Sequence, residues 1–137
     1  MKPSWGPGWI GFGHSYAGDG EYDQAILAYS TAANTMKGSH IPLMCIAGQY
    51  LKMNHFQLCD QYLCNASKLC AWDPQLNHEV AVVDFKRGKY EQAIQRFEHI
   101  LSGDVDSRLQ STVWCNLGQC YLRIKSVFSF TGSQTHS

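Results

Sequence analysis

Six cysteines are the residues of this chain most suited to metal binding or disulfide formation. No two of them form a Cys-x-x-Cys pair, and no Cys–His set has zinc-finger spacing. Cys115 and Cys120 lie five residues apart, which places them about 140° apart around a helix axis, so they do not converge. We therefore expect no metal and no cofactor, and we interpret the cysteines as small, partly buried free thiols in a reducing compartment. The six are Cys45, Cys59, Cys64, Cys70, Cys115 and Cys120.

Two other polar groups could suggest catalysis. His14 and Ser15 are adjacent, but no nucleophile elbow or oxyanion loop accompanies them, and the Gly-Phe-Gly-His stretch is not a phosphate-binding loop. Asp19, Glu21 and Asp23 crowd a helix junction without the ligand order of a calcium loop, so a solvated turn accounts for them. We predict no catalytic residues and no enzyme activity.

The composition argues against two further classes of protein. The 137 residues include eleven basic and eleven acidic residues, and neither sign forms a run, whereas nucleic-acid and membrane-surface proteins need a basic field. No apolar run approaches the roughly 18 residues of a membrane span, and the first residues lack the apolar block of a signal peptide. We expect a location in the nucleus and cytoplasm.

A repeated sequence segment indicates the secondary structure that carries the cysteines, His14 and the acidic residues. GEYDQAIL begins at Gly20 and GKYEQAIQ begins at Gly88, 68 residues later. Half of that spacing is 34, and a degenerate copy, NHFQLCDQYL, begins at Asn54. A period of 34 residues is typical of the tetratricopeptide repeat (TPR), a helix–turn–helix unit.

The same period divides the chain. We predict an all-α, right-handed superhelix (an α-solenoid) of about three and a half TPR units. The predicted parts are an N-terminal flank 1–5, the array 6–125 with repeats 6–39, 40–73 and 74–107 and a half repeat 108–125, and a disordered tail 126–137. The expected helices are 6–18, 22–35, 40–52, 56–70, 74–87, 90–102 and 108–124.

Helix packing explains the repeated letters. A small residue on the first helix of each unit lets the second helix approach, and these residues are Gly13, Ala47, Ala81 and Gly118. The half repeat lacks a second helix. We therefore expect helix 108–124 to expose Leu117, Tyr121 and Leu122 as an association site.

Several stretches carry a more specific resemblance, which covers about Ser4 to Arg123. They are SWGPGWIGFGHSYA, TAANTMKGSHIPLM, HEVAVVDFKRGKYEQAIQRFEHIL and WCNLGQCYLR. Together they resemble TPR subunit six, of the cell division cycle protein 16 type, of the anaphase-promoting complex. The resemblance implies a non-catalytic scaffold in a ubiquitin ligase that controls mitotic exit. It also implies a central slice of a longer array, with other subunits of the complex as partners.

TPR arrays bind peptides in a groove that their first helices line, and in the resembling family a small accessory subunit threads its N-terminal segment there. The alternative is a free-standing TPR adaptor for another extended peptide. The co-chaperone clamp for acidic tails is absent, because its cationic and amide positions hold Ile10, His14, Cys45, Gln75 and Glu79. The predicted groove residues are Ile10, His14, Met44, Gly48, Lys52, His78, Glu79, Val82, Lys86, Asn116, Gln119 and Arg123.

Overall fold

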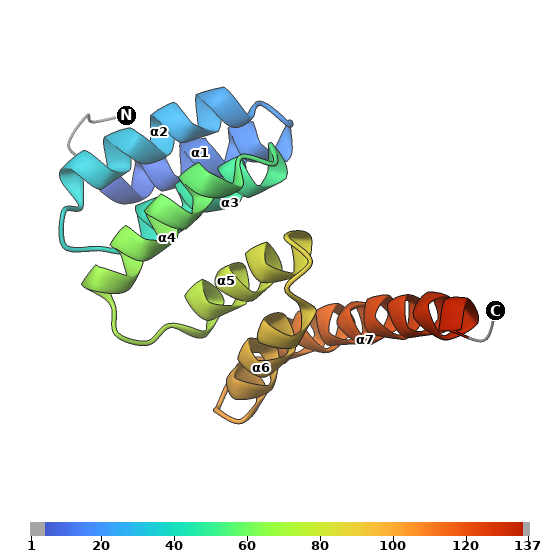
Figure 1. Cartoon of the computed structure of the whole chain (residues 1–137). Helices are drawn as coiled ribbons and strands as arrows, with labels where there is room; N and C mark the ends of the chain where they lie inside the picture. The colour runs from blue at the N-terminus through green and yellow to red at the C-terminus, as the bar shows by residue number, and fades with distance from the viewer. Residues whose placement is uncertain (1–4, 136–137) are drawn as a thin grey trace. The chain divides into compact units, whose positions relative to one another are not determined.

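The computed structural model describes residues 5–135, with side chains up to Val127, and all regular secondary structure in this part is helical (Figure 1). The all-α repeat prediction is confirmed. The first six helices match the predicted ranges to within one residue at each end. The helices are α1 (Gly6–Gly18), α2 (Tyr22–Thr35), α3 (Ile41–Lys52), α4 (Phe56–Leu69), α5 (Pro74–Lys86), α6 (Tyr90–Leu101) and α7 (Ser107–Thr135).

The turn inside each of the three predicted full repeats contains a residue in the left-handed backbone conformation. Gly20, Asn54 and Gly88 are spaced by 34 residues and have positive φ angles of 78°, 62° and 81°. The left-handed conformation ends a helix, and glycine or asparagine adopts it at the lowest cost. The repeated phrase therefore begins with the residue that ends the first helix of each unit.

A hydrogen bond closes each of these turns in the same way. The residue after the left-handed position donates its backbone N–H to a carbonyl five residues earlier, as in a Schellman motif. The three bonds run from Glu21 to Tyr16 at 2.9 Å, from His55 to Tyr50 at 2.9 Å and from Lys89 to Asp84 at 2.8 Å. Carbonyl groups that a helix end leaves without partners are thereby satisfied.

Helix α7 differs from the prediction. The position that corresponds to Gly20 is Lys125, which lacks the left-handed preference, and α7 continues through it to Thr135. No proline follows Pro74 in the sequence, so nothing in residues 126–135 removes a helical hydrogen bond. The predicted helix end at 124 is therefore wrong, because α7 ends at Thr135. The disordered tail 126–137 stays a prediction, and residues 136–137 lie outside the described part.

The first compact unit spans residues 1–76 and contains α1–α4. Its helices lie side by side, because α1 packs on α2, α2 on α3 and α3 on α4 (Figure 1). Ala25, Tyr29 and Ile46 form a buried cluster between them. The predicted close approach at Gly13 is present, since a Cβ placed there would lie only 2.3 Å from Tyr29 Cε1.

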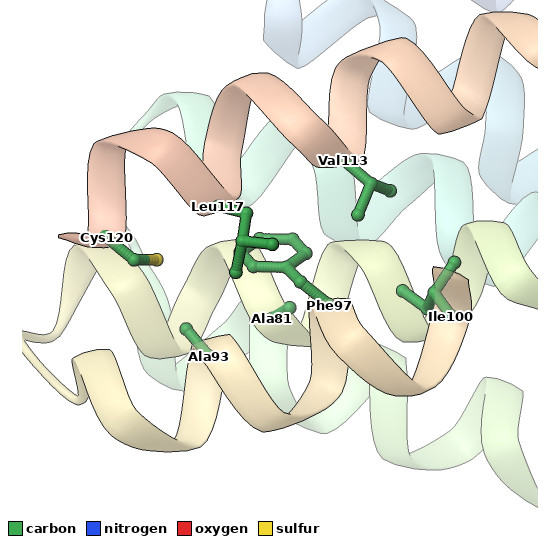
Figure 2. Packing of buried hydrophobic residues seen from close by; sticks show 7 residues of the cluster. All are labelled: Ala81, Ala93, Phe97, Ile100, Val113, Leu117 and Cys120. Carbon is green, nitrogen blue, oxygen red and sulfur yellow. The ribbon is translucent and has the colours of Figure 1, made fainter. Parts of the chain in front are cut away.

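The second unit spans residues 77–137 and contains most of α5, with α6 and α7. Its core centres on Phe97 of α6, toward which Val113 and Leu117 of α7 point (Figure 2). Ala81 of α5 belongs to the same buried cluster. Leu117 is only 4% exposed, so the prediction that it lies on the open face of this helix is wrong: it faces α6.

Candidate peptide-binding surface

The twelve predicted groove residues all lie on α1, α3, α5 and α7, the first helices of the predicted units. Five of them belong to the first compact unit and seven to the second, and each set is described separately. The first set is Ile10, His14, Met44, Gly48 and Lys52. The second set is His78, Glu79, Val82, Lys86, Asn116, Gln119 and Arg123.

His14 is engaged by the neighbouring helix. Its Nδ1 lies 2.7 Å from the hydroxyl of Tyr29 on α2, and the two rings meet edge to face at 5.5 Å. Burial, with a smaller contribution from Cys45, raises the pKa of Tyr29 to about 12, so its hydroxyl stays protonated at neutral pH. The hydroxyl donates to His14 when the imidazole carries its proton on Nε2. His14 therefore satisfies a buried hydroxyl in addition to any contact with a peptide.

Lys52 also contacts a helix of its own unit. Its ammonium nitrogen lies 5.8 Å from the ring centroid of Tyr22 at the start of α2, within cation–π range. By contrast, Gly48 faces open space, because a Cβ there would meet no described atom within 4 Å. Met44 is half-buried, and half-buried Ile10 packs against the first-unit core. The first-unit residues are thus a mixture of packing groups and free surface.

His78 and Asn116 are brought together by the second unit. The Asn116 amide nitrogen lies 2.9 Å from Nε2 of His78, which joins α7 to α5. His78 is only 7% exposed, and burial lowers its pKa, which favours the neutral ring. With Nε2 accepting, the ring proton is on Nδ1, which is buried and meets no hydrogen-bond partner in the part of the chain that the structure describes. These two predicted residues thus bind each other.

The rest of the second-unit set divides by exposure. Val82 is half-buried and packs against the core around Phe97, and Glu79 is half-buried as well. Lys86, Gln119 and Arg123 are exposed. The second unit therefore offers two cations and one amide to an acidic or polar peptide.

The burial of the cysteines varies more than predicted. Cys59 and Cys120 are buried, whereas Cys64 and Cys115 are exposed rather than partly buried. Within residues 5–135, no group of three His, Cys, Asp or Glu side chains is placed to hold a metal ion. In the same range, the structure contains no helix whose length and apolar content would suit a bilayer crossing.

Sequence reasoning missed the polar pair of His40 and Asp73. His40 Nε2 lies 2.5 Å from Asp73 Oδ2, although the two residues are 33 positions apart. The other carboxylate oxygen of Asp73 accepts the backbone N–H of Gln75 at 2.8 Å and so caps the start of α5. The sequence predicted a helix from residue 74, but nothing in the sequence indicated that His40 pairs with the capping carboxylate.

Known proteins resemble the chain along most of its length. No family model matches it. The anaphase-promoting complex subunit cut9 of Schizosaccharomyces pombe is 36% identical over 129 residues, which is 91% of this chain and 19% of that protein. The human cell division cycle protein 16 homolog is 39% identical over 97 residues, which is 71% of this chain and 16% of that protein.

A solved structure gives the same result in three dimensions. The crystal structure of the APC/C hetero-tetramer Cut9–Hcn1 superposes with a TM-score of 0.85 at 36% identity, covering 92% of this chain and 25% of the matched chain. The chain thus spans about a fifth of the length of cut9. Over the segment that it spans, the chain belongs to the TPR family of anaphase-promoting complex subunit 6, the Cdc16/Cut9 proteins.

Proposed function

We propose that this chain is a non-catalytic TPR scaffold segment that works within the anaphase-promoting complex, in the ubiquitination that drives mitotic progression. The observation that carries the proposal is the 36% identity to cut9 along 91% of the chain, together with the close match to the Cut9 fold. A scaffold acts by presenting surfaces, and the helices here present exposed polar groups on α5 and α7. We place this activity in the nucleus and cytoplasm.

The proposed partners are other subunits of the complex. The Cut9 relative forms a hetero-tetramer with Hcn1, and we propose that an accessory chain of that kind binds along the predicted groove residues. Lys86 and Arg123 supply positive charge there, and Asn116, which is paired with His78, is the nearby polar group. A peptide that carries acidic or carbonyl groups suits these donors.

Affinity purification of the tagged full chain from dividing cells tests the scaffold proposal. Recovery of anaphase-promoting complex subunits is the expected result. Recovery of chaperones alone contradicts the proposal, because it indicates a chain that does not assemble. Recovery of one unrelated peptide-bearing protein, without the complex, favours a free-standing adaptor instead.

Charge reversal tests the groove separately. The double variant Lys86→Glu and Arg123→Glu should lose the accessory chain while the circular dichroism spectrum stays unchanged, because both side chains are exposed. The matched control, Lys37→Glu with Lys68→Glu, changes net charge equally at exposed sites outside the predicted groove. Lys52→Glu is less informative, since it also removes the contact with Tyr22. Equal binding by both double variants places the contact elsewhere.

A further inference from the structure

Ser126 lies in the part of α7 that continues beyond the predicted half repeat, and basic residues precede it. Arg123 stands three residues before Ser126, and Lys125 stands directly before it. An apolar residue, Val127, follows. The side chains of Ser126, Arg123 and Lys125 are all exposed. A serine in such a basic and apolar setting matches the charge pattern that basophilic protein kinases select in their substrates.

Ser126 also continues the row of predicted groove residues on α7. Asn116, Gln119, Arg123 and Ser126 are spaced by three, four and three residues, which places them along one face of the helix. Residues three apart on a helix are neighbours, with about 5–6 Å between their Cβ atoms. A phosphate on Ser126 therefore lies within reach of the guanidinium of Arg123, one of the two exposed cations of the second-unit groove set.

Ser111 offers a comparison on the same helix. It is exposed, and Arg108 precedes it by three residues, as Arg123 precedes Ser126. A kinase binds its acceptor in an extended segment, so an acceptor within a helix must first open locally. Opening around Ser111 would withdraw Val113, which is 0% exposed, from the second-unit core. The fold therefore protects Ser111.

The turn around Ser126 is packed less tightly. Residues 123–127 include no buried side chain: Ile124 is half-buried and Val127 is 56% exposed. With residues 88–92 around the start of α6, these two side chains line an open hollow of about 360 Å³ in place of a close-packed core. Opening around Ser126 therefore costs less free energy than opening around Ser111.

We propose that Ser126 is a phosphorylation site for a basophilic protein kinase, and that its phosphate pairs with Arg123 and removes a cation from the predicted groove. The kinase transfers the γ-phosphoryl group of ATP. A bond forms between Ser126 Oγ and the γ-phosphorus, while the bond from that phosphorus to the β,γ-bridging oxygen breaks. ADP leaves, and the hydroxyl proton passes to the catalytic carboxylate of the kinase.

The regulatory consequence rests on the proposed function, because it assumes that an accessory chain binds at Arg123. Phosphoserine carries a charge of about −1.5 to −2 at pH 7 and accepts charge-assisted hydrogen bonds from a guanidinium. Arg123 is then engaged by the phosphate, and an acidic peptide meets repulsion at this end of the row. We expect the phosphorylated chain to bind its accessory chain at least tenfold more weakly.

Treatment of the full chain with calmodulin-dependent protein kinase II and ATP tests the site, because this kinase reads an arginine three residues before its acceptor. Mass spectrometry should find phosphate on Ser126 at least ten times faster than on Ser111. Arg123→Gln should slow the modification of Ser126 at least tenfold, whereas Arg108→Gln, the matched control, should leave it unchanged. Equal rates at the two serines, or no phosphate on Ser126, overturn the proposal.

Phosphorus NMR of the phosphorylated chain tests the pairing without any ligand. The second ionisation of phosphoserine has a pKa of about 6, and a neighbouring guanidinium lowers this pKa because it favours the doubly charged form. After prolonged kinase treatment, the phosphate of Arg123→Gln should titrate at a higher pH than that of the parent chain, while Arg108→Gln should match the parent. The same phosphate pKa in all three chains overturns the pairing.

Binding of Hcn1, the chain that assembles with Cut9, tests the consequence. Kinase treatment should weaken Hcn1 binding at least tenfold, and Ser126→Ala, treated alike, should bind as the untreated parent does. Unchanged binding by the phosphorylated chain overturns the regulatory consequence. An untreated chain that does not bind Hcn1 contradicts the groove proposal and with it that consequence, whereas the kinase rates and the phosphate pKa still decide the site and its pairing.

Discussion

Helices α1 and α7 carry the same motif but bury different faces. In α1, Gly13 is buried against α2, while Phe12, beside it, is 45% exposed. In α7 the order is reversed, because Gly118 is exposed and Leu117 is 4% exposed. A helix with this motif can thus pack against neighbours on two sides. In α1 the neighbour α2 buries the glycine side, and in α7 the neighbour α6 buries the leucine side.

The two helices also end differently. Helix α1 ends before Gly20, whose φ of 78° turns the chain back toward α2. In α7 the matching position is Lys125, and the helix passes through it. Glycine at this position in α1 thus goes with a turn that brings α2 onto α1. Lysine at the same position in α7 goes with a helix that continues and leaves one face exposed.

The largest expected difference between α1 and α7 lies at Phe12 and Leu117, which occupy the same place in the motif. Leu117→Ala should lower the free energy of unfolding by about 2–5 kcal/mol, because it leaves a cavity beside Phe97. Phe12→Ala should change it by less than about 1 kcal/mol, because the ring is already half in solvent. Urea unfolding of the two variants measures both values. Equal losses would mean that the buried faces are misassigned.

The glycines should show the reverse order. Gly13→Leu should cost about 1–3 kcal/mol or more, because the new side chain overlaps the ring of Tyr29. Gly118→Leu should cost nothing and can stabilise the chain by up to about 1 kcal/mol, since leucine favours a helix over glycine. Thermal melting of both variants tests this. A large loss at Gly118 would show that a neighbour covers it.

The helix ends offer a third, smaller test. Gly20→Ala should cost about 1–2 kcal/mol, and the cause is conformational alone: the φ is positive, but a Cβ there meets no described atom within 4 Å. Asn54→Gly is the matched change, because it relieves the same strain at a φ of 62° and should stabilise the chain slightly. Chemical denaturation compares the two. A stable Gly20→Ala chain would show that this turn does not depend on the left-handed residue.

The sequence predicted the first six helices well because local signals agree there. The turn residues at Gly20, Asn54 and Gly88 and the proline at the start of α5 act within a few residues, and the 34-residue spacing repeats the turn residues along the chain. The end of α7 was missed because the prediction interpreted the loss of repeat pattern after Lys125 as loss of structure. An existing helix can extend residue by residue where no residue breaks it, and residues 126–135 contain no proline.

The candidate site was harder to predict, because its contacts join residues far apart in the chain. Repeat position placed His14 and His78 on the correct helices, but it did not show that Tyr29 binds one and Asn116 the other. Leu117 was assigned to the open face for a similar reason. Its neighbour Gly118 shares the motif, and a rotation of about 100° between adjacent residues separates the covered side from the free one.

The polar contacts of the two helices give the smallest expected effect. Exposed His14 of α1 pairs with Tyr29, whereas Asn116 of α7 pairs with buried His78, whose pKa burial lowers from its ordinary value of 6.5. Below about pH 6.5 the unfolded chain binds a proton that the folded ring refuses. The contribution of His78 to the free energy of unfolding should therefore be constant above that value, fall as the pH is lowered from about 6.5 toward the folded pKa, and level off below the folded pKa.

His78→Phe should remove this part of the pH dependence, because it keeps an aromatic ring beside Phe97 but cannot take up a proton. His14→Gln, the control on α1, should retain the slope of the parent chain, since it leaves His78 in place. Urea unfolding followed by circular dichroism at about pH 7.5 and about pH 5.5 measures the change. A slope that survives in His78→Phe assigns the acid sensitivity to other groups. A slope that disappears ties the acid sensitivity to the contact between His78 of α5 and Asn116 of α7.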